Sequence, residues 1–197
     1  MALLIDSIQA RHLFHAGALI MGNVGLVPYV NYDGLGNFSY TSQGMYAGWN
    51  GFTLGCWVNF AGPTGYLASV YEAPNDKVWR LDTGFGNPTF AVSGDGANDV
   101  EVSSSITYAA NTWYFVAARY NPSTEIAIWV NDTKNVNAVG VPASLFVTDV
   151  PSFVIGGDNL ASALLECKIS MFFFCDAVLA DVYLTTLYSL GRAMFNQ

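Results

Sequence analysis

The stretch NTWYFVAARYNP (residues 111–122) decides the fold, because it is apolar on both sides of an extended backbone. Successive side chains of a β-strand point to opposite faces, so Val116 lies on one face and Phe115 on the other. A strand that is apolar on both faces has to be covered on both. We therefore expect residues 111–122 to form a central strand of a buried sheet.

A second stretch, FTLGCWVNF (52–60), alternates with the same period of two. One face carries Phe52, Leu54, Cys56, Val58 and Phe60, and the other carries Thr53, Gly55, Trp57 and Asn59. Further strands are predicted at TGYLASVY (64–71), KVWRLDT (77–83), PTFAVSG (88–94), VEVSSS (100–105), EIAIWVND (125–132), SFVIGGD (152–158) and ECKISMFFFC (166–175). Many short strands without a long helix favour an all-β, two-sheet antiparallel sandwich.

One segment has a helical period. In ADVYLTTLYSLGR (180–192) the residues Val182, Leu184, Leu187 and Tyr188 are spaced as on one side of a short helix, and Gly191 is expected to end it.

Length and composition fit one globular domain with few charges. The chain has 197 residues, with 52% hydrophobic, 15% aromatic and only 11% charged residues, against a usual charged fraction of about 25%. This balance excludes a disordered chain. The formal net charge of −8 opposes binding to nucleic acid and to anionic membrane surfaces.

The N-terminal segment stands apart from the strand pattern. Residues 1–25 are expected to form an arm or docking segment, and residues 26–197 the sandwich. Histidines, glycines and a proline interrupt the uncharged stretch 12–32, which argues against a membrane span. The apolar residues 13–21 need a cover, either the sandwich's own sheet or a neighbouring subunit.

Three cysteines without a CxxC pair indicate buried free thiols, as in proteins made in a reducing compartment. They are Cys56, Cys167 and Cys175. A Cys167–Cys175 bridge is the alternative.

The order and spacing of these segments resemble the laminin-G-like, concanavalin A-like jelly-roll modules. The resemblance runs over residues 28–191, from VNYDGLGNFSYTS (30–42) through the strands above to KISMFFFCDAVLADVYLTTLY (168–188). The chain departs from the pattern of these modules at Phe115, Asp132 and Ser170, where they carry a histidine, a glycine and an acid. The resemblance implies a jelly-roll fold and a binding role, since the group includes lectins, adhesins, carbohydrate modules and glycosidases.

Glycoside hydrolysis needs paired carboxylates, and the sequence contains no Glu-x-Asp-x-x-Glu strand such as the glycosidase branch uses. The four glutamates lie in different strands or loops: Glu72, Glu101, Glu125 and Glu166. A pairing of Glu166 with Asp82 or Glu101 is the catalytic alternative. We expect no enzyme activity and no required cofactor.

Two loop groups are candidate sites. Asp95, Asn98 and Asp99 in GDGAND supply hard oxygens for calcium, as do Asp158 and Asn159, although Asp and Asn are also ordinary turn residues. His12 and His15 lack a third zinc ligand nearby in the sequence.

The second group is a candidate sugar site. Stacking of a sugar needs an exposed aromatic face, and the loop residues Trp49 and Tyr46 are the best candidates, with Asp158 and Asn159 as hydroxyl ligands. Trp57, Trp79 and Trp129 lie on strands and are expected in the core.

These observations predict a non-catalytic protein that works by contact. We expect no export signal or anchor, and the few charges suit a surface covered by other subunits. We therefore expect a virus or phage particle component, such as a capsid decoration or tail protein, made in the host cytoplasm and homo-oligomeric. A carbohydrate-binding, lectin-like and extracellular module is the alternative, and a glycoside hydrolase is a third.

Overall fold

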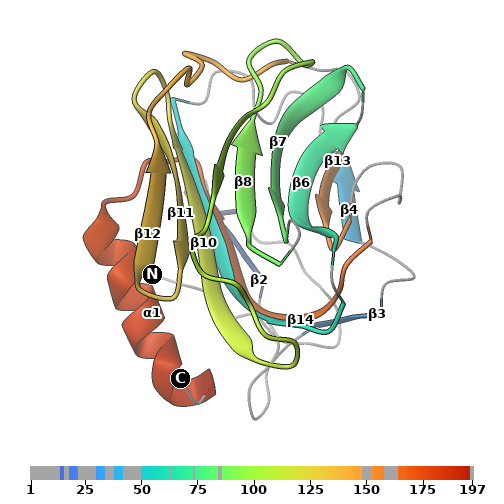
Figure 1. Cartoon of the computed structure of the whole chain (residues 1–197), viewed down its shortest axis with the longest axis vertical. Helices are drawn as coiled ribbons and strands as arrows, with labels where there is room; N and C mark the ends of the chain where they lie inside the picture. The colour runs from blue at the N-terminus through green and yellow to red at the C-terminus, as the bar shows by residue number, and fades with distance from the viewer. Residues whose placement is uncertain are drawn as a thin grey trace.

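The computed structural model describes residues 14–15, 18–21, 30–33, 38–41, 50–62, 64–72, 74–83, 86–147, 152–157 and 164–195. Within them the chain forms two antiparallel sheets and one helix, arranged in three layers (Figure 1). The predicted two-sheet β-sandwich with a C-terminal helix is confirmed.

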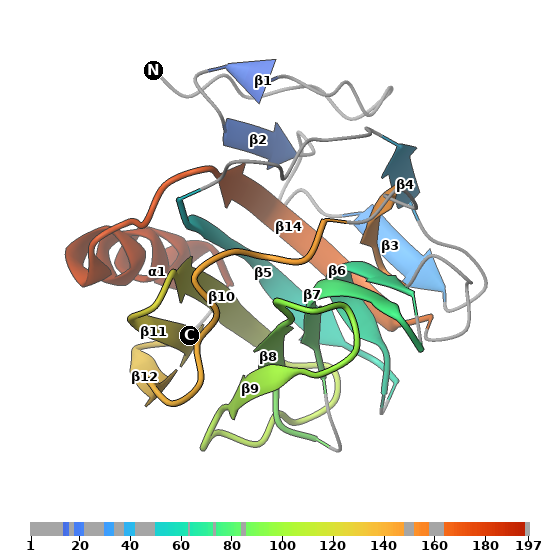
Figure 2. The same cartoon turned by 90° about the horizontal axis from the view of Figure 1, so that it is seen from above.

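The larger sheet has eight strands. Its order is β1 (Phe14–His15), β2 (Ala18–Met21), β14 (Glu166–Cys175), β5 (Phe52–Phe60), β10 (Trp113–Asn121), β11 (Glu125–Val130) and β12 (Thr133–Asn137), with β3 (Val30–Asp33) also paired to β14. Figure 2 shows this order from β1 at the top to β12 at the lower left.

The smaller sheet has six strands and lies face to face with the larger one (Figure 1). Its order is β4 (Phe38–Thr41), β13 (Ser152–Ile155), β6 (Tyr66–Glu72), β7 (Asp76–Asp82), β8 (Thr89–Val92) and β9 (Val100–Ser103).

The central strands β5 and β10 are buried on both faces, as the sequence of residues 111–122 predicts for β10. Cys56 and Val116 are register partners and belong to the cluster between the two sheets. Trp57 and Phe115, the next register pair, belong to a second cluster on the opposite face. The larger sheet therefore needs a cover on each side.

The helix α1 (Asp181–Phe195) supplies the second cover. It lies against the outer face of the larger sheet (Figure 1). The indole of Trp57 stacks on Phe195 with ring centroids 4.5 Å apart and on Tyr188 at 5.9 Å. Leu184 is fully buried beside them.

The predicted glycine stop at Gly191 is wrong, because the helix continues to Phe195. Gly191 is a buried residue of the helix interior, and a Cβ built on it would overlap the Trp57 indole. The glycine thus allows a close approach of helix and sheet. Val182, predicted on the packed side, is 65% exposed.

A buried arginine holds the start of the helix. Arg119 of β10 donates a 2.6 Å hydrogen bond to Asp181 and a 2.7 Å bond to the carbonyl of Leu179, and it also pairs with Glu125. Lys134 of β12 donates to the other Asp181 oxygen at 3.0 Å. Three strands and the helix N-terminus are joined by this ion-pair cluster.

Two sequence expectations are refined in the described residues. Cys56 and Cys167 are buried free thiols, as predicted, but the free thiol of Cys175 is only half-buried. Burial also raises the pKa of Cys56, which keeps it protonated and unreactive. The strand β12, with the sequence TKNVN, was not predicted because it lacks apolar alternation.

The described part of the N-terminal arm lies on the sandwich's own sheet. β2 pairs with β14, with Met21 opposite Phe172 and Ala18 opposite Cys175. His15 lies in β1, whereas His12 and most of the arm fall outside the described residues. The boundary at residue 25 stays a prediction.

Among the described residues, α1 is the only helix, and it lacks the length and apolar character to span a membrane.

Replacing Gly191 by alanine should destabilise the protein by about 1–3 kcal/mol, because the methyl group must displace the Trp57 indole or the helix. The gain in helix propensity, at most about 1 kcal/mol, works in the other direction. Urea unfolding followed by tryptophan fluorescence measures the difference. The exposed Ser189→Ala is the matched control. A Gly191→Ala protein as stable as the control would contradict this packing.

The ion-pair cluster should make stability depend on acid. Burial raises the pKa of Glu125 and Asp181, but hydrogen bonds and charges from Arg119 and Lys134 outweigh it and hold both below their ordinary values of 4.5 and 3.8. Since the folded-state pKa values are the lower ones, this stability is complete above the ordinary values. It is lost as pH falls through the folded-state values.

Asp181→Asn should therefore cost about 0.5–1 kcal/mol at pH 7, because the Asp181 side chain is half exposed. The loss of stability between about pH 5 and pH 2 should also be smaller in this variant. Urea unfolding across that range checks both, with the exposed Asp132→Asn as control. Identical pH profiles for Asp181→Asn and the wild type would count against the cluster.

Candidate functional site

The outward face of the six-stranded sheet carries the richest set of polar side chains among the described residues. In β7, Trp79 and Leu81 point into the core, so Arg80 and Asp82 point outward. Arg80 lies in register with Ala91 of β8, and Ala91 lies in register with Glu101 of β9. We call this surface the polar face. It consists of Tyr66, Tyr71, Lys77, Arg80, Asp82, Thr89, Asp99, Glu101 and Ser103, of which Tyr71, Asp82 and Thr89 are each only 8% exposed.

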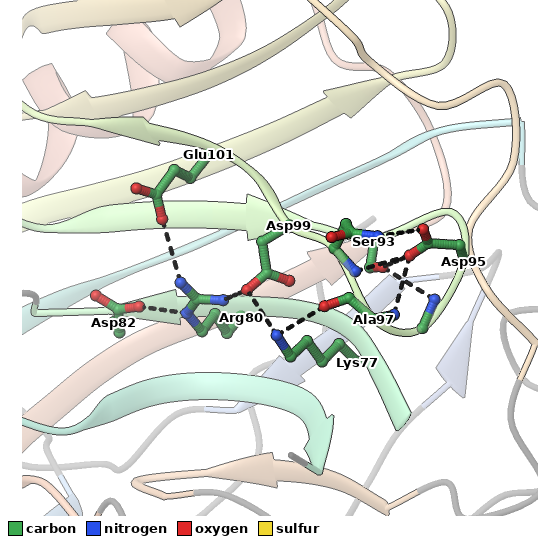
Figure 3. A network of polar contacts seen from close by, with 10 residues as sticks. Lys77, Arg80, Asp82, Ser93, Asp95, Ala97, Asp99 and Glu101 are labelled. Atoms are coloured by element: carbon green, nitrogen blue, oxygen red, sulfur yellow. Dashed lines mark hydrogen bonds and ion pairs between the residues drawn. The ribbon is translucent and has the colours of Figure 1, made fainter. Parts of the chain in front are cut away.

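Arg80 is the centre of the polar face (Figure 3). Its Nε donates to Asp82 at 2.8 Å, Nη2 donates to Glu101 at 3.2 Å, and Nη1 donates to Asp99. The guanidinium also lies over the ring of Tyr71, 5.1 Å from its centroid. Burial lowers the pKa of Arg80, but the charges of Asp99 and Asp82 outweigh it and raise the pKa further, so the group is always charged.

The second cation, Lys77, is also engaged. Its ammonium donates to the carbonyl of Ala97 at 2.9 Å and lies 3.8 Å from Asp99. Lys77 and Arg80 thus fix the β8–β9 loop to β7 (Figure 3).

The structure brings Asp95 and Asn98 together but points Asp99 elsewhere. Asp95 accepts hydrogen bonds from the side chain of Asn98 at 2.7 Å and from the backbone of Asn98 and Ala97 at 2.8 and 2.9 Å. These bonds hold the pKa of Asp95 well below its usual value. Asp99 faces Arg80 instead.

No three His, Cys, Asp or Glu side chains gather as a metal site within the described parts of the chain. The bonds of Asp95 are those of an ordinary Asx turn. Calcium binding by Asp95, Asn98 and Asp99 stays a prediction, which would require Asp95 to exchange hydrogen bonds for the ion.

The predicted ligand-binding residues Trp49, Tyr46, Asp158 and Asn159 lie outside the described residues, and their role stays a prediction. The predicted core positions of Trp57, Trp79 and Trp129 are confirmed, since each is at most 3% exposed.

Hydroxyl and amide groups continue the polar face toward β9. Thr89 and Ser103 share a hydrogen bond of 2.9 Å, and Thr107 donates to Asn87 at 3.0 Å. Tyr66 packs edge-on against Tyr71, with ring centroids 5.4 Å apart. Carboxylates, hydroxyls and aromatic edges on one surface are the groups that bind a polyhydroxylated ligand.

The carboxylates considered as a catalytic pair do not come together around Glu166. Glu101 and Asp82, weighed above as catalytic partners of Glu166, both bind Arg80. Glu166 begins β14 in the other sheet. Glu125 pairs with Arg119 on the outer face of that sheet, with a lowered pKa.

Sequence reasoning missed Arg80 and Tyr71 as site residues. The signal was present for Arg80, because the alternation in KVWRLDT places Arg80 and Asp82 on one face. No such signal was present for Tyr71, since the register of β6 on β7 shifts between Val70 and Tyr71.

Known structures share this fold at low sequence identity. The binding domain of Paraclostridial Mosquitocidal Protein 1 superposes with a TM-score of 0.63 at 12% identity, over 91% of this chain and 47% of that one. The receptor-binding domain of botulinum neurotoxin mosaic serotype C/D gives 0.55 at 13% identity, over 72% and 36%. Botulinum neurotoxin type C gives 0.52 at 14% identity, over 73% and 36%. The chain spans less than half the length of each.

No curated protein matches the chain. The concanavalin A-like lectin/glucanases superfamily matches residues 35–180, which is most of the chain and includes the strands β4 to β14. The chain therefore belongs to the concanavalin A-like lectin/glucanases superfamily.

Proposed function

We propose that this protein is a non-catalytic carbohydrate-binding module whose ligand site is the polar face. The observation that carries the proposal is the Arg80 network. In a chain with only 11% charged residues, five of them converge on one outward sheet surface. Fixed carboxylates beside hydroxyls are suited to hydrogen bonding with sugar hydroxyls.

The ligands of similar folds favour a glycan. Botulinum neurotoxin type C depends on interaction with two ganglioside molecules to get into cells, and the binding domain of botulinum neurotoxin DC was solved with SialylT. The Arg80 network adds an observation from the chain itself.

The carboxylate environments support a binding role over catalysis. A glycosidase needs a general acid whose pKa is raised toward neutrality. Among the described carboxylates with a shifted pKa, Asp95, Glu125 and Asp181, every shift is downward. Asp82 and Glu101 are both held in ion pairs with Arg80.

Contact with other protein subunits is the second candidate, as in a virus or phage particle. The observation that favours it is an apolar stripe on α1, formed by Tyr183, Leu190 and Met194, which are 60%, 66% and 44% exposed. Exposed apolar side chains spaced along one helix side suit a protein partner. If the protein binds other subunits, we expect it in the virion. If it binds glycans, we expect it outside the cell.

A panel of immobilised glycans tests the proposal. We expect the wild type to bind at least one glycan, and Arg80→Lys to bind it at least tenfold more weakly, because lysine cannot hold three carboxylates at once. Arg192→Lys on α1 is the matched control and should bind normally. Ser103→Tyr provides a second test, since a bulky side chain at this exposed position should block the polar face without breaking the network.

Other outcomes have distinct meanings. Release of reducing sugar from a bound glycan would contradict the non-catalytic role. Failure to bind any glycan, combined with a native mass of several subunits by light scattering, would replace the proposal with the second candidate.

A further inference from the structure

The polar face has a small excess of negative charge, since it contains the acids Asp82, Asp99 and Glu101 and the bases Lys77 and Arg80. Residues 66–103, which include β6 to β9, contain six acids and two bases. Their net charge of −4 is half of the formal −8 of the whole chain. A ligand that approaches the polar face therefore meets an acidic segment of the chain.

The two cations of the face are occupied by the protein itself. Arg80 directs Nε, Nη1 and Nη2 at three different carboxylates and stacks on Tyr71. Lys77 binds a backbone carbonyl and lies beside Asp99. An anionic ligand is normally held by a charge-assisted pair with such groups, and it would first have to break these pairs.

The most accessible charged group of the network is a carboxylate. The Glu101 side chain is 57% exposed, whereas those of Arg80, Asp82 and Asp99 are between 10% and 17% exposed. Only one oxygen of Glu101 binds Arg80 in the network. A carboxylate in this position accepts hydrogen bonds from hydroxyls and repels another carboxylate or a sulfate.

We propose that the polar face selects uncharged glycans and discriminates against sialylated and sulfated ones, with Glu101 as the residue that sets this preference. The inference rests on the proposed function, because it names the ligand class of the same site. It differs from what the ganglioside-dependent neurotoxin would suggest, since gangliosides carry sialic acid.

Paired glycans that share one neutral core, with and without a terminal sialic acid, test the preference. Isothermal titration should give at least about tenfold tighter binding of the uncharged member at an ionic strength of 0.01 M, where the Debye length is about 30 Å. At 0.1 M the Debye length falls to about 10 Å, and the difference in affinity between the two glycans should become smaller.

Two isosteric variants localise the effect. Glu101→Gln keeps a hydrogen bond to Arg80 but removes the exposed charge. The ratio of the affinities for the two glycans should therefore fall several-fold. Glu166→Gln removes the charge of another exposed glutamate, at the start of β14 in the other sheet. It should leave the difference in affinity between the two glycans unchanged. Circular dichroism verifies that both variants keep the fold.

Each remaining outcome decides a specific point. Equal or tighter binding of the sialylated member by the wild type would overturn the preference while the proposed function stood. Equal narrowing by both variants would also overturn it, since the overall charge and not Glu101 would then set the selectivity. If no glycan of either class bound, the proposed function would fail, and this inference with it.

Discussion

The rest of this structure depends on two-sided burial of the central strands β5 and β10. Each strand carries large apolar side chains on both faces, such as Val58 and Trp57 in β5, so the larger sheet cannot leave one face in water. The six-stranded sheet covers one face and α1 covers the other. Burial of a tryptophan such as Trp57 removes about 150–250 Å² from water, which is worth on the order of 4–6 kcal/mol.

Because the smaller sheet covers the larger one with its inner face only, its outer face can be polar. With its inner residues committed to the core, β7 alternates Trp79 and Leu81 with Arg80 and Asp82. The carboxylates that fix Arg80 also rigidify the surface that a ligand would meet. Binding to a preformed surface costs less conformational entropy than binding to one that must be ordered.

Much of the fold could be predicted from the sequence because strand periodicity is a local signal. Residues 52–60 and 166–175 form strands with the predicted bounds. The side-chain directions in the run MFFFC could not be predicted, since it is apolar throughout. A β-bulge after Ser170, with Met171 at φ 52°, shifts the alternation so that Phe172 and Phe174 face the inter-sheet core.

The candidate site was less predictable, because it depends on contacts between strands. Arg80 meets Glu101 only through the β7–β8–β9 register, which no local pattern specifies. Gly191 illustrates the same limit: locally it is typical of a helix end, but its contact with Trp57 places it inside the helix.

Native-state hydrogen exchange tests two-sided burial most directly. If α1 is an integral layer, the amides of Leu184 and Tyr188 should exchange with the same opening free energy as those of β5 and β10, through global unfolding. The edge strands β9 and β12 should exchange sooner. Helix amides that open several kcal/mol more easily than the central strands would show that the sandwich is stable without α1, and would contradict the account.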